Sequence, residues 1–113
     1  MNFYGTLFIP KEKVKEFLEL RLYSNFLKCC VYKVEIKKTK KFKYYNIRTF
    51  IEKTNEHYSS IIYASFIENV YGDLFLHRLD RTLGANMLYE LMKLGFIYDN
   101  TDMKEFKERN GGG

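Results

Sequence analysis

Cations and aromatic rings are concentrated in one short stretch of this chain, residues 33–53. The stretch holds eight Lys and Arg residues against two Glu residues, a net charge of +6, whereas the whole chain carries +5. All of the excess positive charge therefore lies in this stretch, where it is interleaved with aromatic side chains. Aromatic faces stack on unpaired bases while cations contact phosphates, so the stretch predicts a binding surface for a polyanion, with nucleic acid as the first candidate.

Period-two alternation predicts that this stretch forms an antiparallel hairpin, with strands over 29–37 and 42–53. Tyr45, Ile47 and Ile51 are expected to face the core, and the basic and aromatic side chains to face outward. The predicted binding residues are Lys33, Lys37, Lys38, Lys40, Lys41, Phe42, Lys43, Tyr44, Arg48 and Phe50. The alternative is an edge hairpin that lysines keep soluble, but four lysines within five residues exceed that need.

Asp73, His77 and Asp80 form the second group with possible chemistry. If residues 73–80 were helical, the three side chains would share one face, where two carboxylates and an imidazole could bind a divalent metal. With Arg81 to hold a phosphate, the group resembles a sketch of a phosphodiester-cleaving site. A helix cap and ion pairs explain the same residues without chemistry, and we predict no metal site here.

The two cysteines, Cys29 and Cys30, are adjacent in the sequence. Neighbouring cysteines rarely bridge each other, because the ring would strain the peptide between them, so free thiols are expected. The chain has no nucleophile motif, no phosphate-binding glycine loop and no pair of CxxC motifs. We therefore predict no catalytic residue and no cofactor.

The composition, 46% apolar and 18% aromatic, is that of a folded protein rather than a disordered one. The chain contains no apolar run of about 18 residues, and its start lacks the order of a signal peptide, so we expect a cytoplasmic location. We expect a single domain over 1–98 and a polar tail or short helix over 99–110. The glycines at 111–113 look like a linker.

The first half of the chain predicts a strand over 2–9, a helix over 10–23 that begins at a proline, and then the hairpin. The hairpin turn lacks an Asn-Gly or Gly-Gly pair, so a longer or mobile loop is expected.

The second half predicts a helix over 54–72, whose apolar face would include Ile62, Phe66 and Val70, and a short helical segment over 73–79. A further helix over 82–94 carries a core stripe, and 96–98 is a candidate final strand. The stripe consists of Leu83, Met87, Leu88, Leu91, Met92 and Leu94. The expected fold is α+β, a small antiparallel sheet with a central basic hairpin and helices packed on one face, in the order β-α-β-β-α-α.

Residues with A/T-rich codons are abundant in this chain and those with G/C-rich codons are scarce, which indicates a low-G+C genome. Many short basic chains from such genomes belong to phages and other mobile elements. In this general respect the chain is similar to small phage-encoded proteins that block host defence machinery, such as anti-CRISPR proteins. The resemblance implies that it would block by binding an acidic protein surface, a guide RNA or the nucleic acid itself, since a chain of net charge +5 is a poor mimic of DNA.

The charge pattern favours a small non-enzymatic binding or inhibitor protein of phage or mobile-element origin. Its expected partner is a nucleic-acid-handling protein or ribonucleoprotein complex, or RNA or DNA directly, and not a membrane. The first alternative is a free-standing DNA- or RNA-binding regulator, in which a helix reads the groove and the hairpin contacts the backbone. The second alternative is a small metal-dependent nuclease.

Overall fold

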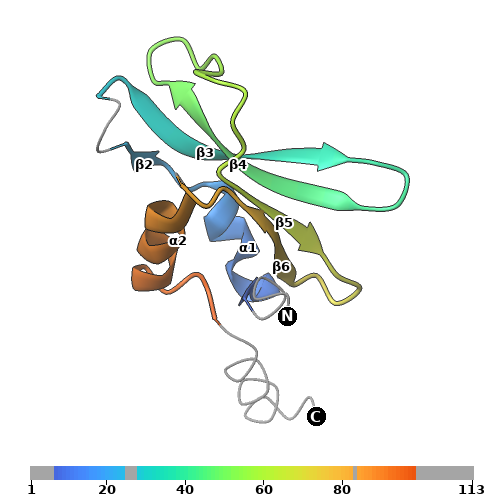
Figure 1. Cartoon of the computed structure of the whole chain (residues 1–113). Coiled ribbons are helices and arrows are strands. Elements are labelled where there is room, and N and C mark those ends of the chain that lie inside the picture. Colours follow the sequence, from blue (N-terminus) through green and yellow to red (C-terminus); the bar gives the residue numbers. More distant parts are fainter. Residues whose placement is uncertain (1–6, 25–27, 83, 99–113) are drawn as a thin grey trace.

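The computed structural model describes residues 7–24, 28–82 and 84–98, in which six strands form one antiparallel sheet and two helices pack against it (Figure 1). The sheet has the order β1-β6-β5-β4-β3-β2 and curls into a half-barrel. The expected α+β class with an antiparallel sheet is therefore confirmed. The elements are β1 (Phe8–Ile9), α1 (Lys11–Leu18), β2 (Leu22–Tyr23), β3 (Cys30–Lys38), β4 (Lys43–Ile51), β5 (Ala64–Glu68), β6 (Leu74–Leu79) and α2 (Gly84–Lys93).

The long hairpin of β3 and β4 confirms the expectation from alternation. Its register runs from the pair Cys30 and Ile51 to the pair Lys38 and Lys43. The connection consists of the four residues 39–42 between the last pair, Lys38 and Lys43, so the expectation of a loop longer than two residues is confirmed. The backbone N–H of Thr39 donates to the Phe42 carbonyl at 2.8 Å, and Oγ1 of Thr39 accepts from the N–H of Phe42 at 3.1 Å. The threonine side chain thus closes a turn that has no glycine or asparagine.

The helices expected over 54–72 and 73–79 do not form, and these predictions were wrong. β5 and β6 occupy this part of the chain as a second hairpin, with β5 paired to β4. Phe66 is fully buried, whereas Val70 is 92% exposed in the turn, so the two side chains share no helical face. Because the edge of β4 offers unpaired backbone groups, long-range strand pairing outweighs the local helical pattern. The element order becomes β-α-β-β-β-β-β-α.

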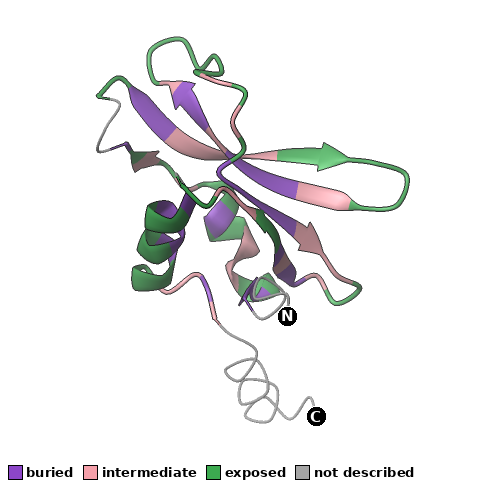
Figure 2. Ribbon diagram, viewed as in Figure 1, coloured by how far each residue is buried: buried purple, intermediate pink, exposed green. Residues whose placement is uncertain are grey.

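The core lies between the helices and the concave inner face of the sheet, where Figure 2 shows buried residues in both layers. Phe17 of α1 meets Phe66 of β5 edge to face, with ring centroids 5.5 Å apart. The helix predicted over 82–94 is confirmed as α2, and its stripe is partly in the core. Met87, Leu88 and Leu91 are buried, Met92 and Leu94 are 45% and 52% exposed, and Leu83 lies outside the described residues.

The first and last elements are shorter than predicted. The first helix ends at Leu18 instead of residue 23, because Leu22 and Tyr23 pair with β3 as the edge strand β2. The expected final strand contributes one bridge, in which Phe8 and Tyr98 exchange backbone hydrogen bonds of 2.8 and 2.9 Å. The beginning of the strand expected over 2–9, the tail at 99–110 and the glycines at 111–113 lie outside the described residues.

Candidate functional site

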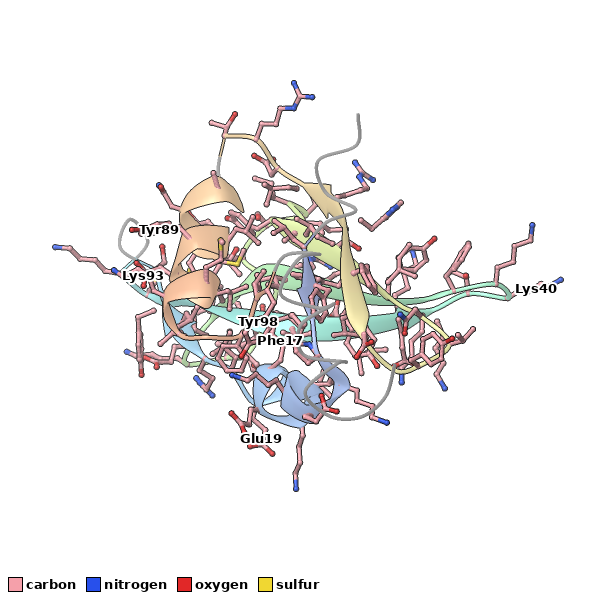
Figure 3. All side chains as sticks on the ribbon, turned by 90° about the horizontal axis from the view of Figure 1, so that it is seen from below. Phe17, Glu19, Lys40, Tyr89, Lys93 and Tyr98 are labelled. Atoms are coloured by element: carbon pink, nitrogen blue, oxygen red, sulfur yellow. The ribbon has the colours of Figure 1, made fainter. Side chains whose placement is uncertain are left out.

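The hairpin tip, residues 37–42, projects from the body of the molecule (Figure 1). All six of its residues are exposed, and Phe42 is 47% exposed. In Figure 3, Lys40 marks its far end, on the opposite side of the molecule from Tyr89 and Lys93 of α2. Within the described part of the chain, the lysines of the hairpin tip form no ion pair. Four unpaired cations and one exposed ring therefore occupy a single projection.

Lys43 and Tyr44 lie behind the tip and are half-buried. Nζ of Lys43 lies 4.0 Å from Oε1 of Glu68 and 5.3 Å from the centroid of the Tyr45 ring. Tyr45 itself belongs to the core, as predicted, and its hydroxyl donates to Glu68 at 2.6 Å. Burial, and then the hydrogen bond to Glu68, raise the pKa of Tyr45 above its ordinary value. Lys43 thus has a partner within the chain, in contrast to the lysines of the hairpin tip.

Arg48, also predicted to bind, is held by contacts at the base of the hairpin. Nη1 of Arg48 lies 3.2 Å from Oε1 of Glu35, and Nη2 donates to the Ser59 carbonyl at 2.8 Å. The other carboxylate oxygen of Glu35 lies 2.7 Å from Nε2 of His57. Burial acts to raise the pKa of Glu35, but the hydrogen bonds and charges of His57 and Arg48 outweigh it, and the pKa is lowered.

The expectation that Phe50 faces solvent was wrong, because this side chain is only 8% exposed. His57 covers it, with ring centroids 4.8 Å apart, and Nζ of Lys33 lies 5.0 Å from the Phe50 centroid. Lys33 also donates a hydrogen bond to the side chain of Asn55. The segment after β4 folds back across this end of the sheet and covers Phe50. The alternation of apolar and polar residues therefore placed Phe50 on the correct face of the sheet, but it could not show that another segment buries that face.

A groove of about 700 Å³ is open on the outer face of the sheet, the face turned away from the helices. A β-bulge shapes it: Ser65 pairs with Arg78 and Phe66 pairs with Leu76, which leaves His77 as the extra residue of β6. His77 and Arg78 are consecutive, and both line the groove and are exposed. The groove, called the outer groove below, is lined by Lys37, Thr39, Tyr44, Asn46, Ser60, Ile61, Ile62, Ser65, His77, Arg78, Leu79 and Asp80.

The group that a helix would make of Asp73, His77 and Asp80 does not form, because residues 74–79 are a strand and not a helix. Asp73 lies at the start of that strand and accepts a hydrogen bond of 2.9 Å from the N–H of Lys11, whereas Asp80 follows its end. Among the described residues, no three His, Cys, Asp or Glu side chains are grouped closely enough to hold a metal ion. His77 belongs instead to the outer groove.

The outer groove was missed by sequence reasoning, although Lys37 and Tyr44 had been selected from the hairpin. Three of its other polar residues, Ser65, His77 and Arg78, come from β5 and β6, where helices were expected. The sequence carries no local signal for the bulge, because residues 74–76 are all apolar and show no alternation that His77 and Arg78 could interrupt.

Cys29 and Cys30 form no disulfide in the structure, and their Sγ atoms lie 3.7 Å apart. Cys30 is buried at the start of β3 and Cys29 is exposed. Burial raises the pKa of the Cys30 thiol, and the neighbouring Cys29 adds to the shift. Deprotonation of Cys30 is therefore disfavoured, which fits a packing role.

No protein-family model, curated protein or solved structure matches this chain. No helix in the described residues is long and apolar enough to cross a membrane.

Proposed function

We propose that this protein is a non-enzymatic inhibitor that binds and occludes a nucleic-acid-handling complex. The observation that carries the proposal is the hairpin tip, which presents four lysines without ion-pair partners on a projection that also exposes Phe42. Like charges held so close together repel, so their placement costs folding free energy unless a ligand neutralises them. A polyanion is the ligand that such a surface attracts.

A complex that contains both protein and nucleic acid fits the tip better than bare duplex DNA. All four cations are lysines, which are compact point charges, whereas arginine is the usual reader of base edges. The charge is confined to one projection, and so few cations give only modest nonspecific affinity at physiological salt. The lysines can steer the encounter, while the Phe42 ring adds apolar contact area where it meets a pocket.

The test replaces Lys37, Lys38, Lys40 and Lys41 with Glu and leaves Lys43, which is paired with Glu68. The matched control reverses the same number of exposed lysines elsewhere, at Lys11, Lys15, Lys28 and Lys53. Wild type and both variants are immobilised and incubated with a lysate of the host, with and without nuclease, and the bound proteins are identified by mass spectrometry.

We expect wild type and the control variant to retain the same nucleic-acid-handling proteins and the tip variant to lose them. Equal retention by the tip variant would overturn the proposal. Recovery of bulk nucleic acid that nuclease releases, with no protein partner left, would also overturn it.

The regulator alternative needs a helix that can enter a DNA groove. The exposed side of α2 presents Tyr89, Glu90 and Lys93, and the last two form an ion pair with each other at 3.7 Å. Such a helix has no excess of cations to offer phosphates, which favours the hairpin as the contact surface. A gel shift with mixed oligonucleotides separates the two proposals, since tight sequence-selective binding by the protein alone supports the regulator.

A further inference from the structure

Three rings form a continuous track from the hairpin tip into the outer groove. The centroids of Phe42 and Tyr44 lie 6.1 Å apart, and those of Tyr44 and His77 lie 5.8 Å apart. The rings come from the turn, from β4 and from β6. Phe42 is 47% exposed and His77 is also exposed, so two of the three rings are open to solvent.

Cations lie on both sides of this track. Lys37 is the cross-strand partner of Tyr44, and Arg78 follows His77 in β6. Neither cation forms an ion pair within the described residues. Two charges that can meet phosphates therefore flank rings that can meet bases.

Asn46 and Ser65 lie between the two cations, and the serine hydroxyl donates to Oδ1 of the amide at 2.6 Å. Both residues are buried, so they fix the floor of the groove. Asp80 is the acidic residue of the lining, and its Oδ1 accepts a hydrogen bond of 3.0 Å from the N–H of Thr82. Its contact with the chain beyond β6 gives this carboxylate a role in the turn there.

We propose that the outer groove binds a segment of single-stranded nucleic acid, with bases stacked on Phe42, Tyr44 and His77 and phosphates at Lys37 and Arg78. The inference rests on the proposed function, and it names the component of the complex that the protein touches. The bases of a duplex are paired and stacked on one another, so they cannot stack on the three protein rings. A single strand presents the faces of its bases one after another. An acidic peptide would satisfy the cations but leave the rings without partners.

The bulge in β6 is the structural cause of this site. In a regular strand His77 and Arg78 would point to opposite faces, and only one of them could meet the track. The bulge places both in the groove, beside Tyr44. The tip lysines continue the same path outward, since Phe42 belongs both to the tip and to the track.

The test measures fluorescence anisotropy of a labelled 12-nucleotide oligouridylate, an oligothymidylate of equal length and a 12-base-pair DNA duplex, each over a series of salt concentrations. We expect wild type to bind the single strands more tightly than the duplex. Tyr44→Ala and His77→Ala should each weaken single-strand binding about tenfold, as the loss of one stacked base predicts. Arg78→Gln should reduce the slope of log affinity against log salt by about 0.7, the value for one phosphate of a single strand.

Two control variants distinguish a specific loss of single-strand binding from a general loss of structure. Tyr44→Phe retains the ring and should bind like wild type, and Tyr89→Ala removes an exposed tyrosine of α2 and should also leave binding unchanged. Single-strand affinity equal to wild type in both Tyr44→Ala and His77→Ala would overturn the inference. The proposed function would still stand if the tip variant lost its captured complex, so the two proposals fail separately. Wild type that binds the duplex as tightly as the single strands would likewise overturn the inference.

Discussion

Lys11 and Asp73 are joined by a hydrogen bond of 2.9 Å, in which the backbone N–H of Lys11 donates to Oδ1 of Asp73. Lys11 is the first residue of α1, and the preceding Pro10 provides no side-chain cap. Asp73 precedes β6, and its own N–H donates to the side chain of Asn69 at 3.0 Å. A carboxylate from the β5–β6 turn therefore takes the place of a local N-cap and ties the first helix to the sheet.

Asp73→Ala should lower the free energy of unfolding by about 1 kcal/mol, the typical cost of losing a helix cap. Asp73→Asn keeps an acceptor oxygen and should retain most of that stability. Chemical denaturation of the three proteins measures the difference. An alanine variant as stable as wild type would show that α1 does not need this cap.

Gly84→Ala should destabilise the protein by about 1 to 3 kcal/mol, as overpacking of a core does. A Cβ at Gly84 would lie 2.3 Å from the Tyr63 carbonyl oxygen and 2.8 Å from Cδ1 of Leu79. The carbonyl belongs to the backbone and accepts a hydrogen bond from Asp80, so it cannot move freely. Ala85→Ser, at an exposed neighbouring position, is the control and should change the unfolding free energy by less than about 0.5 kcal/mol.

Thr39→Ala should loosen the hairpin tip without unfolding the sheet. The variant loses both hydrogen bonds between Oγ1 and the backbone of Phe42, each 3.1 Å long. Thr39→Ser keeps the hydroxyl and is the matched control. We expect faster hydrogen exchange of the Phe42 amide in the alanine variant only, measured by NMR at a pH where the rest of the hairpin stays protected. Equal exchange in the two variants would contradict this role of the hydroxyl.

The stability contributed by Glu35 should depend on pH. Its pKa in the folded protein is lowered from the ordinary 4.5, so its contacts with His57 and Arg48 stabilise the fold above that ordinary value. The contribution is lost as the pH falls through the lowered pKa of the folded state. Unfolding free energies of wild type and Glu35→Gln, measured from neutral to acidic pH, should therefore converge as the pH falls. A constant difference across that range would contradict the prediction.

The β3–β4 hairpin could be predicted because its signal is local. Apolar and polar residues alternate through the first strand, and Tyr45 and Ile47 continue the pattern in the second. β5 could not be predicted in the same way, since the five residues Ala64–Glu68 are too few to show a period and their spacing also suits a helix. Its conformation is decided by pairing with β4, which lies at a distance in the sequence.

The exposure of the hairpin tip followed from its composition, since four lysines in five residues have to lie in solvent. The burial of Phe50 did not follow, because it depends on how the segment that contains His57 folds back over the strand. The outer groove depends on a bulge between two strands that contact each other only in the folded state. Local patterns therefore indicated candidate binding residues, and tertiary contacts decided which of them share a surface.

The position of β1 in the sheet has a consequence for synthesis on the ribosome. The partners of Phe8 are Phe75 in β6 and Tyr98, so they are made long after it. The meander from β3 to β6 needs only neighbouring strands and can form while the chain is still growing. β1 can join the sheet only after that meander has emerged from the ribosome. Of the strands in the sheet, the one that is translated first is therefore among the last to be paired.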